Sequence, residues 1–112
     1  MHWEKLTDIT QLDEIDRNSA ANKVMIFKHS RHCSISKTVL SRIEKKWSDE
    51  FDEKLTAYYL DLLTYRSLSS AIAERYGVMH QSPQILIISN GKCIYSQTHS
   101  AISVEDIMEA VN

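Results

Sequence analysis

Apolar residues along the 112-residue chain follow two different spacings. Short runs rich in β-branched and aromatic residues predict strands, whereas apolar positions that recur every three or four residues predict amphipathic helices. Strands are predicted at 23–27, 55–63, 84–89 and 92–98, and helices at 7–20, 34–47, 67–77 and 103–111. The predicted order is therefore helix, strand, helix, strand, helix, strand, strand, helix.

Local signals mark the ends of several of these elements. Thr7 is a candidate N-cap of the first helix, and Ser103, with Asp106 three residues later, forms an approximate capping box for the last. Gly77 suits the left-handed residue that often ends a helix. Asn90-Gly91 favours a type I′ turn, so the last two strands are predicted to form a hairpin.

Strands that alternate with helices indicate parallel pairing, and the hairpin adds one antiparallel strand. Right-handed crossovers then give an α/β fold with a four-stranded mixed sheet and helices on both faces. An extended piece around Trp3 precedes the first helix, and the charged segment 44–54 is expected to be a solvated helix end and loop. With two glycines, one proline and no repeat, residues 1–112 are expected to form a single domain.

Composition excludes several functional classes. A content of 43% hydrophobic and 25% charged residues is typical of a globular domain, and the formal charge of −2 argues against nucleic-acid binding. The longest uncharged apolar stretch, 85–89, is too short to span a membrane, and no signal peptide is recognisable. We therefore expect a cytoplasmic protein with reduced thiols, which acts as a monomer or weak dimer. The five histidines show no metal-ligand spacing, so no metal site is expected.

The segment "FKHSRHCSISK" (27–37) places Cys33 between a strand and a helix. Unpaired N–H groups and the positive end of the helix dipole at such a position favour a thiolate over a thiol. Basic side chains crowd the same segment: Lys28, Arg31, Lys37 and, when protonated, His29 and His32. The predicted role of Cys33 is that of a reactive thiol; the alternative is a small core residue, because free cysteines are often buried.

Ser36 stands where a CxxC pair would carry its second cysteine. Cys33 can then form only a mixed disulfide that an outside thiol must resolve, which predicts monothiol exchange. The alternative for Ser36 is a capping residue in the first helical turn. Cys93 is expected to be a packed strand residue, against the alternative that it resolves Cys33 or forms an intermolecular disulfide.

Pro83, the only proline, directly precedes the third predicted strand of the sheet. This position, together with a thiol where the first core strand meets its helix, is typical of the thioredoxin-like fold. Most X-Pro bonds are trans, but this fold predicts a cis Ser82-Pro83 bond. The backbone of Ser82 would then lie beside Cys33 and pair with a substrate backbone.

The motifs "HCSIS", "HQSPQILIISNGK" and "YSQTHSAIS" resemble the YtxJ-type bacilliredoxin-like proteins, a monothiol branch of the thioredoxin superfamily, over essentially the whole chain. The family has a TCPIS-like motif, so Cys33, Ile35 and Ser36 carry over, whereas His32 and Ser34 replace its threonine and proline. The resemblance implies removal of bacillithiol from S-thiolated proteins, with bacillithiol as co-substrate and with no metal, flavin or other cofactor.

The malate carboxylates of bacillithiol would suit the basic cluster of Lys28, Arg31 and Lys37. Thr98, His99, Ser100 and the start of the last helix are further candidates. The residues expected to contact substrate are Lys28, Arg31, His32, Ser34, Ile35, Ser36, Ser82, Pro83 and His99.

Other classes fit the sequence less well. "THSAIS" has no glycine, so a glutathione site of the usual type is not supported; Ser34-Ile35 does not match the Gly-Phe of iron–sulfur glutaredoxins, and the arginine signature of ArsC-type relatives is absent. The alternative from a different class is a non-enzymatic binding or redox-sensing module that uses the Ser82-Pro83 groove for β-augmentation.

Overall fold

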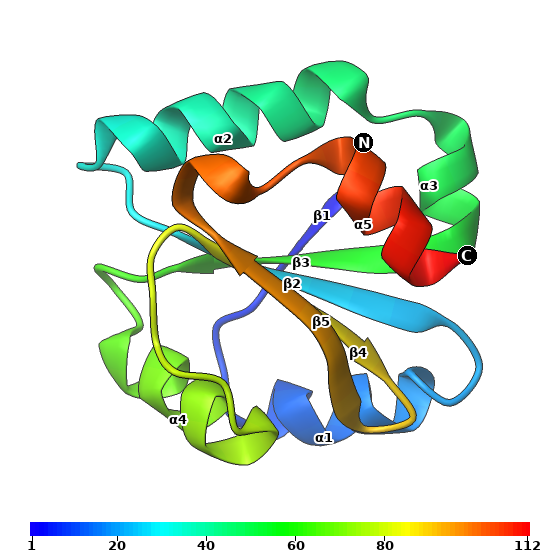
Figure 1. Ribbon diagram of the computed structural model, residues 1–112. Helices are drawn as coiled ribbons and strands as arrows, with labels where there is room; N and C mark the ends of the chain where they lie inside the picture. The colour runs from blue at the N-terminus through cyan, green and yellow to red at the C-terminus, as the bar shows by residue number, and fades with distance from the viewer.

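The strands form one mixed sheet in a computed structural model that describes residues 1–112. The strands are β1 (Trp3–Lys5), β2 (Lys23–His29), β3 (Leu55–Asp61), β4 (Gln84–Ser89) and β5 (Lys92–Thr98), in the spatial order β1-β3-β2-β4-β5. The helices are α1 (Thr10–Asn18), α2 (Ser34–Lys46), α3 (Asp49–Lys54), α4 (Arg66–Tyr76) and α5 (Val104–Val111), with a 3-10 turn η1 (His99–Ala101) before α5. Helices α1 and α4 cover one face, and α2, α3 and α5 cover the other (Figure 1).

The sheet has five strands, so the predicted number of four is wrong. Strand β1 pairs in parallel with β3, with Trp3 opposite Ala57. The Trp3 ring stacks on Phe27 at 5.8 Å and meets Tyr59 edge-on at 5.9 Å between ring centroids. The extended piece expected around Trp3 is this strand, but three residues with only one partly buried side chain have no apolar run that would predict their pairing in the sheet. The Trp3 ring thus holds β1 against β2 and β3 through contacts with residues distant in the sequence.

Two predictions about helices need correction: the start of the first helix and the segment 44–54. Helix α1 starts at Thr10, three residues later than expected, because Asp8 accepts hydrogen bonds from the Thr10 N–H and hydroxyl, both at 2.9 Å. Thr7 is therefore not the cap. The segment expected as a solvated loop contains α3, whose Phe51 is buried and stacks on Trp47 at 4.6 Å. Phe51 packs this short helix against the core.

Several local predictions are confirmed. Gly77 ends α4 with φ 66°, and Asn90 and Gly91 have φ 52° and 74°, as a type I′ hairpin turn requires. The Ser103 hydroxyl accepts a hydrogen bond from the Asp106 N–H at 3.2 Å and so caps α5. No helix is long and apolar enough to cross a membrane.

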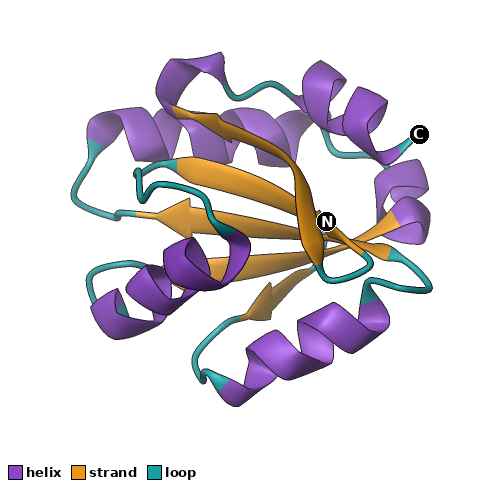
Figure 2. Cartoon of the chain, turned by 60° about the horizontal axis from the view of Figure 1, so that its bottom comes forward, coloured by secondary structure: helices purple, strands orange, loops and turns teal.

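Strand β2 lies at the centre of the sheet and is buried from Val24 to His29. Met25 and Phe27 pack under α2, α3 and α5, whereas Val24 and Ile26 pack on α1 and α4. Figure 2 shows the resulting arrangement, with the sheet between two helical layers. This continuous burial fixes the carboxyl end of β2, which leads directly into the loop that carries Cys33.

Candidate functional site

Cys33 lies at the N-cap of α2 with an extended backbone, φ −101° and ψ 119°. Its N–H donates to the Ser30 carbonyl at 3.1 Å, and its carbonyl accepts from the Lys37 N–H at 3.1 Å. The thiol is free and partly exposed. No protein group accepts from the N–H groups of residues 34–36, and no side chain caps the helix. Cys33 therefore sits beside backbone donors that stabilise negative charge at a helix start.

Ser36 is fully buried, and its hydroxyl connects three segments of the loop. Its Oγ accepts from the Ser30 N–H at 3.1 Å and lies 2.6 Å from His29 Nδ1. A neutral imidazole that accepts at Nδ1 completes this pattern, with the Ser36 O–H as donor. The Ser36 side chain thus holds the loop from β2 to α2 in place. The expectation that it contacts substrate is wrong for the side chain, because it has no exposed surface.

His29 faces the α2 side of the sheet and is buried, so it adds no exposed positive charge beside the thiol. Its ring stacks on Phe27 at 5.7 Å and contacts Tyr59 at 5.5 Å between centroids. Burial lowers the pKa of His29, although the negative charge of Asp61 acts in the opposite direction. The neutral form agrees with its role as the acceptor for Ser36.

Lys28 lies on the opposite face of the sheet from α2, since neighbouring strand residues point to opposite faces. Its side chain has no exposed surface; Nζ donates to the Ser69 carbonyl at 3.1 Å and lies 3.5 Å from His80 Nδ1. Burial lowers the pKa of Lys28 to about 8. The predicted role of Lys28 in an exposed anion-docking cluster is therefore wrong.

Arg31 remains at the surface but is paired with Asp61. Asp61 also accepts from the Thr64 hydroxyl at 2.8 Å and the Leu63 N–H at 3.2 Å. Burial opposes ionisation of Asp61, but the Thr64 hydrogen bond and the charge of Arg31 outweigh it and lower the pKa of Asp61. Arg31 is thus anchored at the end of β3, with part of its charge already neutralised.

The Ser82-Pro83 peptide bond is cis, the isomer that the fold interpretation predicts. Pro83 is buried, and neither backbone polar group of Ser82 forms a hydrogen bond within the protein. The His99 N–H donates to the Pro83 carbonyl at 2.9 Å. Gln84 is opposite both Lys28 in β2 and Thr98 in β5. Pro83 and His99, the neighbours of Gln84 and Thr98 in the chain, therefore lie at the end of the sheet where β2 leads into the Cys33 loop. The structure thus gathers Ser82, Pro83 and His99 at the end of the sheet that carries the thiol.

Cys93 lies at the other end of the sheet. It is opposite Ile88, which in turn is opposite Val24 near the start of β2. His29 lies five residue steps farther along β2 than Val24, a distance of about 16.5 Å at ~3.3 Å per strand residue. A disulfide needs Cα atoms within about 7 Å. Cys93 is a packed strand residue, as expected, and its Sγ donates to the Tyr95 carbonyl at 3.3 Å.

The surface around the thiol is completed by exposed side chains on both sides of Cys33 in the chain. Ile35 is 47% exposed, and His32 and Ser34 are also exposed. No group of three or more His, Cys, Asp or Glu side chains is placed to hold a metal ion.

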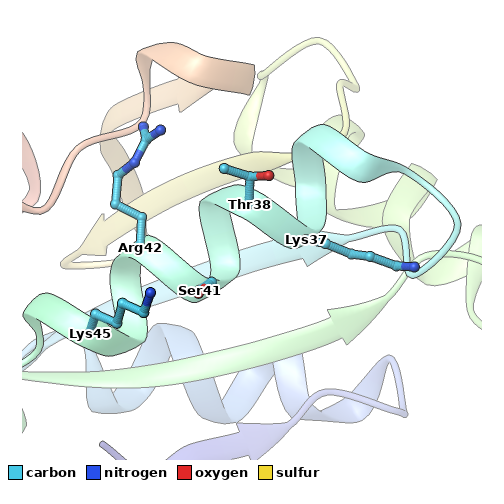
Figure 3. Close-up of a pocket in the computed structure, with 5 residues that line it drawn as sticks. All are labelled: Lys37, Thr38, Ser41, Arg42 and Lys45. Carbon is cyan, nitrogen blue, oxygen red and sulfur yellow. The ribbon is translucent and has the colours of Figure 1, made fainter.

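Sequence reasoning did not single out a second cationic surface on the same helix. The residues that line it, which we call the α2 cationic face, are Lys37, Thr38, Ser41, Arg42 and Lys45 (Figure 3). They border an open hollow of about 470 Å³. Their three- and four-residue spacing along the polar side of α2 is the signal that would have found it.

The comparisons agree with this geometry. The family model described as "Monothiol bacilliredoxin BrxC" matches residues 4–107. A solved structure described as having a thioredoxin fold is 28% identical, with a TM-score of 0.83, and the match covers 98% of this chain and 94% of that one.

Two thioredoxins show the same fold at lower identity. Malassezia sympodialis thioredoxin (Mala s 13) is 14% identical with a TM-score of 0.76, covering 99% of this chain and 88% of its own. Fasciola hepatica thioredoxin is 12% identical with a TM-score of 0.71, covering 96% and 95%.

Proposed function

Because the chain belongs to the monothiol bacilliredoxin BrxC family, we propose that it removes bacillithiol from S-bacillithiolated proteins through a mixed disulfide on Cys33. Family membership and the thioredoxin fold give it a thiol oxidoreductase-type role. The observation that carries the specific proposal is a free thiol at an open helix start, with the other cysteine at the far end of the sheet.

The reaction consists of two thiol–disulfide exchanges. The Cys33 thiolate attacks the bacillithiol sulfur of the modified protein, the old S–S bond breaks, and the target cysteine leaves as a thiolate that takes a proton from water. A second bacillithiol thiolate then attacks the mixed disulfide on Cys33. Bacillithiol disulfide forms and the Cys33 thiolate is regenerated, so the target protein is reduced and bacillithiol is oxidised.

Each side chain or backbone group near the thiol has a part in this proposal. The open N–H groups of residues 34–36 stabilise the attacking thiolate and the thiolate that leaves when the mixed disulfide is resolved. The free backbone groups of Ser82 pair with the substrate backbone, and exposed Ile35 provides an apolar contact. We assign Arg31 and Lys37 to the malate carboxylates because both are exposed cations near Cys33 in the chain, and we keep His32, Ser34 and His99 as further proposed contacts.

The proposal needs no resident cofactor, because bacillithiol enters as a co-substrate. It places the protein in the cytoplasm, where thiols are kept reduced, acting as a monomer or weak dimer. Its protein partners are those that carry bacillithiol on a cysteine.

Intact mass spectrometry after incubation with bacillithiol disulfide tests the proposal. Wild type and Cys93→Ser should each gain one bacillithiol, located on Cys33, and Cys33→Ser should gain none. Added bacillithiol should then remove the adduct. An internal Cys33–Cys93 disulfide in wild type would show that the monothiol mechanism is wrong.

A second candidate function is a binding or redox-sensing module without turnover. The unpaired backbone of Ser82 and the exposed side chain of Ile35 favour it, since both features also serve peptide binding. Turnover separates the two functions: a sensor would form the Cys33 adduct but would not accelerate release of bacillithiol from a modified protein.

A further inference from the structure

The α2 cationic face combines three positive side chains that have no acidic partner in the protein. Lys37, Arg42 and Lys45 form no ion pair, whereas Arg31, Lys46, Lys54 and Arg75 each pair with a carboxylate. The hydrogen bond from Lys46, at 2.8 Å, is the largest cause that lowers the pKa of Glu105, and the charge of Arg42 is the smallest, so Glu105 is the partner of Lys46. The three unpaired charges therefore face solvent and remain available to a partner.

The net charge of α2 is positive, whereas the net charge of the whole chain is negative. The protein has 13 Lys and Arg against 15 Asp and Glu, yet α2 carries four cations and one acid, which is a local excess of three. That acid, Glu44, accepts a hydrogen bond from the Trp3 indole at 3.2 Å. A concentrated positive field on an otherwise acidic protein attracts acidic groups toward α2.

The face extends from the reactive thiol along the helix. Lys37 lies one turn after Cys33, and Arg42 and Lys45 follow farther along the helix (Figure 3). At ~1.5 Å per residue, Lys45 lies about 18 Å along α2 from Cys33. An extended peptide covers that distance with about five or six residues. A chain whose cysteine is bound at Cys33 can therefore reach every cation of the face with its flanking residues.

We infer that the α2 cationic face docks an acidic segment that flanks the modified cysteine of the protein substrate. The inference rests on the proposed function and adds a preference among its substrates. The hollow is open to solvent and its lining has no apolar residue, so an extended ligand with several carboxylates fits it better than a small anion held by one exposed cation. The absence of aromatic side chains on the face argues against a single-stranded nucleic acid.

Binding without chemistry is the first test. A Cys33→Ser protein is titrated with three peptides that differ only in four positions flanking a serine: all Glu, all Gln or all Lys. The Glu peptide should bind most tightly and shift the NMR signals of α2 amides. Adding Arg42→Gln and Lys45→Gln should weaken Glu-peptide binding at least about threefold at low salt, with a smaller effect above about 0.3 M salt.

The matched control removes one arginine and one lysine from the other end of the molecule. Arg17 lies in the last turn of α1 and Lys92 follows the β4–β5 turn; both are exposed and form no ion pair. Arg17→Gln with Lys92→Gln changes the net charge equally and should leave Glu-peptide binding at the wild-type level. Equal weakening by the two double variants, or equal binding of the Glu and Lys peptides, would overturn the inference. So would tighter binding of a single-stranded oligonucleotide that displaces the Glu peptide.

A transfer assay separates this inference from the proposed function. Peptides with cysteine in place of serine, each carrying bacillithiol, are incubated with the Cys33 protein. Faster removal from the Glu peptide, with the advantage lost in Arg42→Gln/Lys45→Gln, supports docking. Removal at equal rates from all peptides overturns docking and leaves the proposed function intact. Selective binding without any removal supports docking and overturns the proposed function.

Discussion

The Ser36 hydroxyl oxygen lies 2.6 Å from His29 Nδ1, inside the protein and one helical turn after Cys33. The same hydroxyl accepts the Ser30 N–H, so one buried side chain joins the end of β2, the loop and the start of α2. The residue at the position of a resolving cysteine therefore has a structural role.

Replacing Ser36 with alanine should destabilise the protein and slow the alkylation of Cys33. The change leaves the Ser30 N–H and His29 Nδ1 without partners, and a buried unsatisfied group costs about 1–3 kcal/mol. Urea unfolding measures this loss, and the rate of Cys33 alkylation reports on the loop. Ser34→Ala is the control, because Ser34 is in the same turn but exposed. A Ser36→Ala protein as stable as Ser34→Ala would contradict the role given to the hydroxyl.

Iodoacetamide should alkylate Cys33 well ahead of Cys93 in the folded protein at neutral pH. Burial raises the pKa of Cys93 and outweighs the lowering effect of backbone hydrogen bonds with Tyr95 and Ile87, so little Cys93 thiolate is present. The difference should narrow as the pH rises and Cys93 ionises. Peptide mass spectrometry over time measures both rates, and Cys93→Ser should leave the Cys33 rate unchanged. Equal rates at pH 7 would refute the reactive-thiol assignment.

The sequence pattern was sufficient for the central strands because their apolar runs fill both faces of the sheet. It was not sufficient for β1 or α3, which depend on single aromatic side chains, Trp3 and Phe51, packing against residues distant in sequence. No local spacing contains that information. The thiol position was predictable because a strand, a short loop and an amphipathic helix are adjacent in the chain.

The side chains around the thiol were harder to place. Clustering in sequence suggested that Lys28 and Arg31 lie together, but alternation along β2 puts Lys28 on the face of Val24 and Ile26, away from α2. Strict alternation along the strand predicts that Lys28 and Phe27 point to opposite faces of the sheet, and this separates Lys28 from the cations beside Cys33. The bonds of Ser36 to His29 and of Arg31 to Asp61 depend on tertiary packing and left no signal in the sequence.

Lys28 should make the stability depend on pH in a defined direction. Its pKa is about 8 in the folded protein against 10.5 for an ordinary lysine, so between these values the unfolded chain binds the proton that the folded protein has lost. The free energy of unfolding contributed by Lys28 therefore rises with pH over this window. Below pH 8 the buried charge is fully destabilising.

Lys28→Met removes this dependence and keeps an apolar stem of similar length. The stability of the variant relative to wild type should be highest at pH 7 and fall by up to roughly 3 kcal/mol as the pH rises from 8 to 10.5. Loss of the hydrogen bond to Ser69 shifts the stability difference by the same amount at pH 8 and at pH 10.5, so it does not affect how that difference changes with pH. Urea unfolding of both proteins across this range measures the difference. A constant difference would mean that Lys28 does not titrate there.

Recognition of bacillithiol should depend on the two cations that remain exposed near the thiol, Arg31 and Lys37. The double change Arg31→Gln and Lys37→Gln should slow exchange with bacillithiol disulfide by roughly threefold or more relative to exchange with hydroxyethyl disulfide, because only bacillithiol carries carboxylates. The ratio of the two rates is the informative quantity, since a general change in Cys33 reactivity would alter both. The effect should decrease with added salt.

Asp61 provides the matched test of the same idea. Asp61→Asn keeps the side-chain oxygen that accepts from Thr64 or Leu63 but removes the charge that neutralises Arg31. Exchange with bacillithiol disulfide should become faster relative to hydroxyethyl disulfide, opposite to the Arg31 and Lys37 changes. If all these variants alter the two reagents equally, the cations influence the thiolate alone, and the contacts that orient bacillithiol must come from the backbone of Ser82 and the start of α2.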